Sequence, residues 1–190
     1  MKVVQVMDGT RNIYIVLSNP CSLIAKMIGL YTKAPFNHVS IAFDEQLNKM
    51  YSFGRKHELI PIIGGFVQET IHSQLFKEAN CALYKCTVSE ETYEKMRCFV
   101  EQFALNHERY SYNYIGILGV ILNRELGGKD SYFCSQFVHT VLKQGGIELL
   151  AKPVKLTTPS DFECSEGLEL VYRGYLGLYH DTLTVPKVSS

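Results

Sequence analysis

Residues 38–53 constrain the fold more than any other stretch of the sequence. Apolar side chains alternate with small or polar ones over residues 38–43, a polar turn follows at 44–48, and residues 49–53 form a second β-rich run. Alternation with a period of two is typical of a half-buried strand, and a short polar turn between two such runs is typical of a β-hairpin. The sequence therefore predicts an antiparallel hairpin with His38 at the start of its first strand.

The remaining patterns add further strands and helices. Short β-rich runs predict strands at 13–17, near 65–70, at 81–86 and within 168–179. Helices are predicted where apolar residues recur at helical spacing and where a continuous apolar stretch indicates a largely buried helix. These predicted helices are 23–31, 90–106, 112–123 and 134–144. Since no linker, repeat or low-complexity segment separates the elements, we expect an α+β fold with a single domain over residues 1–190.

Composition and charge exclude several classes of function. Nineteen basic and nineteen acidic residues balance, so no cationic surface is available for nucleic acid. The longest apolar run, 114–122, is far shorter than the roughly 20 residues that a membrane span requires. The amino-terminal residues lack the apolar core of a signal peptide, and the six cysteines form no CxxC pair. We therefore expect a cytoplasmic protein with reduced thiols and with no membrane span, nucleic-acid partner, metal or cofactor.

Cys134 is the candidate nucleophile. It opens the predicted helix 134–144, which ends at a pair of glycines. The first turn of a helix presents free backbone N–H groups and the positive end of the helix dipole, and both favour a thiolate. The same groups can stabilise the oxyanion that forms when a thiolate attacks an acyl carbon, and the backbone N–H of Cys134 is the candidate donor. Without a base nearby, however, Cys134 is simply a small buried core residue.

His38 is the candidate general base. At the start of a strand it can project over a helix amino terminus that packs against the sheet. His139 follows Cys134 on the same helix but lies about 140° away around the axis, too far round to serve. The other histidines lie in polar or loop segments, where solvent exposure is the simpler interpretation, and they remain fallback bases. These fallback residues are His57, His72, His107 and His180.

Two segments resemble a known family. They are IYIVLSNPCSLIAKMIGLYTKAPFNHVSIAFD and YFCSQFVHTVLKQGGI, and together they are similar to the circularly permuted branch of the NlpC-type papain-like cysteine hydrolases, often called YiiX-like. In that family the histidine-led strand precedes the cysteine-led helix, the reverse of the order in papain. Thr32, His38 and the pair Cys134-Ser135 occupy the corresponding places. The resemblance implies a circularly permuted papain-like fold, with a mostly antiparallel sheet and the nucleophile helix packed against it.

The third catalytic residue departs from the family pattern. The resemblance implies a polar residue, often glutamate, on the strand after the histidine strand, where it orients the imidazole through Nδ1. Here that strand carries Ser52, whose hydroxyl holds an imidazolium less strongly than a carboxylate does. Glu69 is the alternative if its segment folds back onto the hairpin. Both residues remain candidates at this point.

Three functions follow from these residues. The first, implied by the resemblance, is a peptidase or amidase that cleaves short or cell-wall-type peptides through an acyl-Cys134 intermediate. The second is the same chemistry on lipid esters, as an acyltransferase or thiol esterase of the lecithin:retinol acyltransferase-like type, with residues 112–122 lining an acyl site. Burial of that helix in the core is the simpler interpretation, so peptide amides come first. The third is a non-catalytic binding module, favoured by the missing carboxylate on the second hairpin strand.

Overall fold

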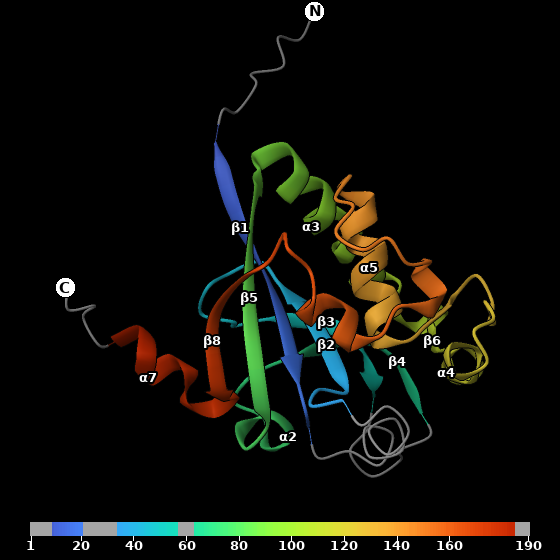
Figure 1. The fold of residues 1–190 in the computed structure, drawn as a ribbon, viewed down its shortest axis with the longest axis horizontal. Coiled ribbons are helices and arrows are strands. Elements are labelled where there is room, and N and C mark those ends of the chain that lie inside the picture. The colour runs from blue at the N-terminus through green and yellow to red at the C-terminus, as the bar shows by residue number, and fades with distance from the viewer. Residues whose placement is uncertain (1–8, 21–33, 57–62, 185–190) are drawn as a thin grey trace, which may run out of the picture.

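Six antiparallel strands form the central sheet, in the order β4-β3-β2-β1-β5-β8 (Figure 1). The computed structural model describes residues 9–20, 34–56 and 63–184. The strands are β1 (Thr10–Ser18), β2 (His38–Ala42), β3 (Met50–Arg55), β4 (Gly64–Glu69), β5 (Asn80–Ser89) and β8 (Glu169–Tyr175). β1 lies in the middle, paired with β2 on one side and with β5 on the other. A separate two-stranded parallel pair joins β6 (Ser111–Tyr112) to β7 (Ser131–Tyr132).

Helices cover both faces of the sheet, and the side chains of β1 alternate between the two core clusters that lie on these faces. Ile13, Ile15 and Leu17 belong to the larger core cluster, which includes buried residues of α3 (Glu90–Leu105) and α5 (Cys134–Gln144). Tyr14 and Val16 point to the other face, where they join a second cluster with residues of α2, η3 and α7. The elements on that face are α2 (Gln74–Lys77), η3 (Leu176–Leu178) and α7 (Tyr179–Thr184).

Aromatic side chains hold α3 and α5 against the hairpin strands. The ring of Phe53 lies 5.3 Å from that of Phe137 on α5 and 6.0 Å from that of Phe103 on α3. The rings of Phe103 and Phe137 are themselves 5.2 Å apart. Edge-to-face and tilted contacts at these distances add to the stability that burial provides. The packing fixes the amino terminus of α5 relative to β2. The remaining short helices are η1 (His107–Arg109), α4 (Tyr114–Ile121), η2 (Val154–Leu156) and α6 (Pro159–Glu163).

Most of the predicted elements are confirmed. The hairpin is β2 and β3, the strands at 13–17, 65–70, 81–86 and 168–179 correspond to β1, β4, β5 and β8, and α5 has the predicted bounds. The side chain of Ser89 caps α3 by accepting a hydrogen bond from the Thr92 N–H at 3.2 Å. The predicted helix 23–31 and Thr32 lie outside the described residues. The α+β class and the mostly antiparallel sheet are therefore established.

The prediction of a buried helix at 112–123 is wrong in one respect. A helix is present, α4, but its fully buried residues are Gly116 and Gly119. Ile117 and Val120 pack against the core only in part, and the other large side chains, Tyr114, Ile115, Leu118 and Ile121, are exposed. The error arose because an apolar sequence was read as a buried one, whereas α4 lies at the edge of the molecule in Figure 1. Among the helices that the structure describes, none is long and apolar enough to span a bilayer.

Candidate active site

His38 opens β2 next to the middle strand of the sheet. Its backbone is paired with Ser18 of β1, and the N–H of Asn37 donates to the Ser18 carbonyl at 3.2 Å, so the pairing begins before the strand itself. Pro35 favours extended backbone at the residue before it, which suits this entry into the strand. The imidazole is largely buried, and the ring of Phe76 on α2 lies 5.9 Å from it.

A buried carboxylate holds the His38 ring. Glu69, the last residue of β4, places Oε1 2.8 Å from His38 Nε2. The hydroxyl of Ser40 donates to the other carboxylate oxygen at 2.5 Å and lies 3.2 Å from the same ring nitrogen. The Glu69 side chain is only 9% exposed, so water screens this ion pair weakly. The resemblance implied that the third residue contacts Nδ1 of the histidine. That expectation is wrong for this chain, because Glu69 contacts Nε2.

A glycine lies beside this pair. Gly54 is on β3, between β2 and β4 in the sheet, and pairs with Gly65. A Cβ atom at Gly54 would lie 3.5 Å from Glu69 Oε1 and 3.9 Å from His38 Cε1. The strand that separates the histidine from the glutamate therefore carries no side chain where the two meet.

Ser52 has a different partner. It is fully buried on β3, and its hydroxyl donates to the backbone carbonyl of Val39 at 2.7 Å. Of the two residues that the sequence left as candidates for orienting His38, the structure brings Glu69 to the ring and engages the Ser52 hydroxyl with the backbone.

Replacing Ser52 with alanine should therefore affect the fold more than the chemistry. We expect the free energy of unfolding to fall by about 1 kcal/mol, the usual net value of such a hydrogen bond. Turnover of an acyl substrate should stay within about twofold of the parent rate, since the His38–Glu69 contact is untouched. Chemical denaturation and a rate assay on the same preparation measure both quantities. A large loss of rate without loss of stability would return Ser52 to the site.

Cys134 is the first residue of α5 and is buried. The preceding residue, Phe133, is extended, with φ −106° and ψ 168°, and makes no side-chain cap hydrogen bond, so the first turn of the helix keeps its backbone N–H groups uncapped by a side chain. Helix α5 packs against β2, and Cys134 lies close enough to His38 to raise the pKa of the ring. Glu69 and Ser40 contact Nε2, so Nδ1 is the ring nitrogen that these two residues do not contact.

The surroundings of His38 favour its protonated form. Burial alone would lower the pKa of the ring, because a charged imidazole loses hydration. The Glu69 carboxylate, hydrogen bonds with Cys134 and Glu69, and the charge of Cys134 outweigh burial and raise the pKa of His38 to about 10. These neighbours therefore favour an imidazolium at neutral pH, paired with the Glu69 carboxylate.

No family model matches the chain, and no curated protein matches it either. The case for a function therefore rests on the geometry of the site itself.

The other histidines are held elsewhere. His139 is buried, and its Nδ1 lies 2.7 Å from the Thr157 hydroxyl, while burial, aided by Lys143, lowers its pKa. His180 Nε2 lies 2.5 Å from the Gln46 carbonyl, and His107 contacts the backbone. His57 lies outside the described residues. Across the described ranges no three His, Cys, Asp or Glu side chains are grouped as metal ligands would be.

Sequence reasoning missed two residues of the site. Ser40 bridges Glu69 and His38, and the alternation of β2 was its only signal, because that pattern places it on the same face as His38. Tyr112 is buried close to Cys134, and burial, together with the charges of Cys134 and Tyr114, keeps its pKa well above the usual value of 10. Nothing local in the sequence marks Tyr112, because β6 reaches the site only through the tertiary fold. It presents an uncharged phenol near the thiol.

Proposed function

We propose that the protein is a cysteine-dependent acyl hydrolase of the permuted papain-like type, with Cys134 as nucleophile, His38 as proton carrier and Glu69 as the residue that holds the ring. The observation that carries the proposal is the 2.8 Å contact between His38 and Glu69, together with Cys134, which lies close enough to raise the His38 pKa and begins helix α5. A carboxylate, an imidazole and a thiol in series form the arrangement that activates a thiol toward acyl groups.

The chemistry follows from the charges. The Cys134 thiolate attacks the acyl carbon, and the backbone N–H of Cys134 donates to the resulting oxyanion. The His38 imidazolium gives its proton to the leaving nitrogen or oxygen as the bond to the acyl carbon breaks, which leaves an acyl thioester on Cys134. Water then attacks this thioester while neutral His38 takes up its proton. Release of the acid restores the thiolate and the imidazolium.

The order of the residues also supports the proposal. His38 precedes Cys134 in the chain, as in the permuted family that the sequence resembles, and the histidine-led strand lies beside the cysteine-led helix. The hypothesis of a non-catalytic module relied on the missing carboxylate of the second hairpin strand. Glu69 of β4 supplies a carboxylate to the ring instead, so that support is lost.

Substrate choice is the open part of the proposal. The sequence favours peptide amides over lipid esters as substrates only if the helix at 112–123 is buried. Since α4 instead exposes apolar side chains, a lipid acyl ester becomes a second candidate substrate on a specific observation. The same acyl-Cys134 chemistry serves both.

Alkylation tests the assignment of the nucleophile. Cys98 and Cys164 are exposed while Cys134 is buried, so accessibility alone would make Cys134 the slower of the three. We expect the opposite at near-neutral pH, because a neighbouring imidazolium and the helix amino terminus favour the reactive thiolate. Iodoacetamide labelling followed by peptide mass spectrometry should show Cys134 modified first.

A matched variant shows whether the labelling rate of Cys134 reflects activation of its thiol or access of the reagent to it. His38→Ala leaves Cys134 in place and opens space beside it, yet should slow its labelling toward the rate of an ordinary thiol. Preferential labelling of Cys98 or Cys164 in the parent protein, or faster labelling of Cys134 in the variant, would overturn the assignment.

A further inference from the structure

Four apolar side chains of α4, with Leu122 at its C-cap, form an exposed stripe on one side of the helix. Ile115 is 64% exposed, Leu118 51% and Leu122 55%, and their spacing of three and four residues aligns them. Tyr114 and Ile121 flank them with about the same orientation, at 38% and 37% exposure. We call these five residues the α4 stripe. A contiguous apolar patch of this kind marks a surface that meets another apolar surface.

The inner side of α4 carries Gly116 and Gly119 beside the partly buried Ile117 and Val120, and the two glycines bring the helix close to its own domain. A Cβ atom at Gly116 would lie 2.2 Å from the Asn113 amide nitrogen, and one at Gly119 would lie 2.5 Å from the Arg124 carbonyl oxygen. No larger residue fits at either position without a shift of backbone or of a buried amide. Rotating the helix to bury the stripe would bring larger side chains to these two close contacts, so the stripe stays outward.

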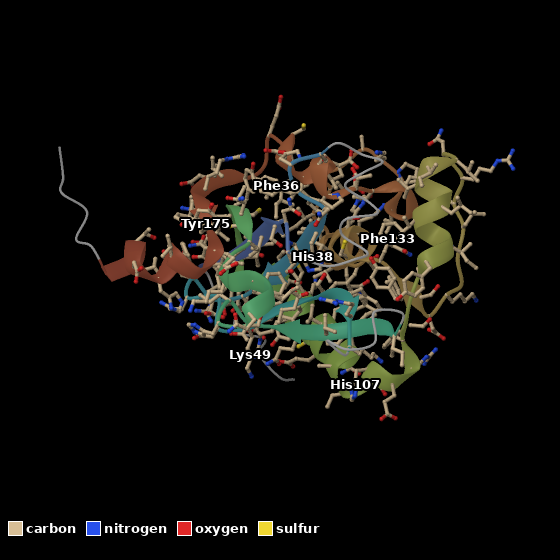
Figure 2. All side chains as sticks on the ribbon, turned by 90° about the horizontal axis from the view of Figure 1, so that it is seen from below. Phe36, His38, Lys49, His107, Phe133 and Tyr175 are labelled. Carbon is tan, nitrogen blue, oxygen red and sulfur yellow. The ribbon has the colours of Figure 1, made fainter. Side chains whose placement is uncertain are left out.

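The stripe begins next to the nucleophile. Asn113 caps α4 by accepting from the Gly116 N–H at 2.8 Å, and its amide donates at 3.2 Å to Gln136, two residues after Cys134 on α5. The rings of Tyr112 and Tyr114 are 4.8 Å apart, and Tyr112 is close enough to Cys134 to feel its charge. In Figure 2, Phe133, which precedes Cys134, lies between His38 and the yellow helix α4.

Charge around the stripe favours a lipid surface over a second copy of the chain. Residues 114–123 carry no charge, and Arg124 and Lys129 are exposed in the loop that follows. Lys155 lies on η2, which packs against α4. Glu125 is the main opposing charge, because Asp130 is already paired with Arg109. A cationic margin around an apolar stripe suits the headgroups of a membrane, whereas two such margins would repel each other across a dimer.

We propose that the α4 stripe docks the protein on a lipid–water interface and presents Cys134 to acyl chains held there. The docking part rests on the stripe and the charges around it, and does not depend on the proposed function. The choice of lipid acyl compounds as substrates rests on the proposed function.

Vesicle binding tests the docking part directly. The unmodified protein is sedimented with vesicles of phosphatidylcholine, with and without phosphatidylglycerol. We expect it to sediment with both and more strongly with the anionic lipid. Changing Ile115, Leu118 and Leu122 together to serine should weaken binding by about tenfold or more, because each of these side chains buries apolar surface in the interface.

A matched control uses three exposed apolar residues away from α4. Leu170, Val171 and Leu178 are 48%, 38% and 54% exposed, and their combined change to serine should leave vesicle binding unchanged. Equal loss in both triple variants, or failure of the parent protein to sediment, would overturn the proposal. A parent dimer that the stripe variant converts to a monomer would also overturn it and would assign the stripe to self-association.

The outcome is separable from that of the proposed function. A water-soluble thioester reports acyl transfer by Cys134 without any vesicle. Turnover of that thioester without vesicle binding would reject docking and keep the hydrolase, whereas vesicle binding by a protein whose Cys134 neither alkylates nor turns over thioesters would keep docking and reject the hydrolase. With both intact, the stripe variant should lose turnover of a vesicle-bound acyl ester and keep that of the soluble thioester.

Discussion

Cys134→Ala should lose at least about 10³-fold in turnover of every acyl substrate that the protein cleaves, because no other group can form the thioester. The change removes one sulfur atom at the start of α5 and leaves the backbone N–H in place, so substrate binding should survive. Steady-state kinetics against a soluble acyl thioester, compared with Cys98→Ala as a surface control, give the measurement.

Stability must be read beside the rate. Cys134 is buried in the larger core cluster, and its loss costs some packing. The free energy of unfolding should nevertheless fall by no more than about 1 to 2 kcal/mol, because only a single sulfur atom is deleted. A folded Cys134→Ala protein that retains turnover would place the nucleophile elsewhere and end the proposed mechanism.

Glu69→Gln should reduce turnover by about 10²-fold and move the alkaline limb of the pH profile to lower pH. Glutamine keeps the size of the side chain and an oxygen for Nε2, but it removes the charge that raises the pKa of His38 to about 10. The ring should then lose its proton at lower pH, and with it the acid for the leaving group. Titration of the His38 ring by NMR checks the cause independently of the rate.

The sign of the stability effect is fixed by the same pair. The pKa of His38 in the folded protein lies above the value of about 6.5 for an unfolded histidine, so the proton on His38 stabilises the fold fully below that pH and ceases to do so as the pH rises through about 10. In Glu69→Gln the His38 pKa should be lower, so the pH above which the His38 proton no longer stabilises the fold should also be lower. Ser40→Ala removes one hydrogen bond to the carboxylate but leaves the charge of Glu69 in place, so it should change the His38 pKa far less than Glu69→Gln does. An unchanged His38 titration in Glu69→Gln would show that another group sets its charge.

The nucleophile helix and the histidine strand could be predicted because their signals are local. The apolar stripe from Phe137 to Leu142 and the glycines after Gln144 define α5 without reference to the rest of the chain. His38 heads a run in which apolar side chains alternate with small or polar ones, and this pattern marks the strand although all five residues of β2 are buried. Their proximity depends on the tertiary fold, in which α5 packs against β2 and Cys134 lies close enough to His38 to raise its pKa.

The third residue and the face of α4 could not be predicted for the opposite reason. Glu69 reaches His38 because β4 pairs with β3, in a register set by the whole sheet rather than by its own neighbours. The sequence of an apolar helix likewise does not show which side of the helix faces the core, because that depends on the elements that pack around it. Gly116 and Gly119 were the available signal, since a helix whose small residues share one side can pack closely on that side.

Gly54 leaves space for the contact between His38 and Glu69, although it takes no part in the proposed chemistry. A Cβ at this position on β3 would lie 3.5 Å from Glu69 Oε1 and 3.9 Å from His38 Cε1, which is ordinary contact, so alanine fits here. A longer side chain would have to share the space beside the acid and the histidine, and we expect it to disturb their contact although the cysteine, histidine and glutamate remain in the sequence. Finding the cysteine, the histidine and the glutamate in a related sequence is therefore not enough to predict activity. The residue at the position of Gly54, on the strand between β2 and β4, has to be compared as well.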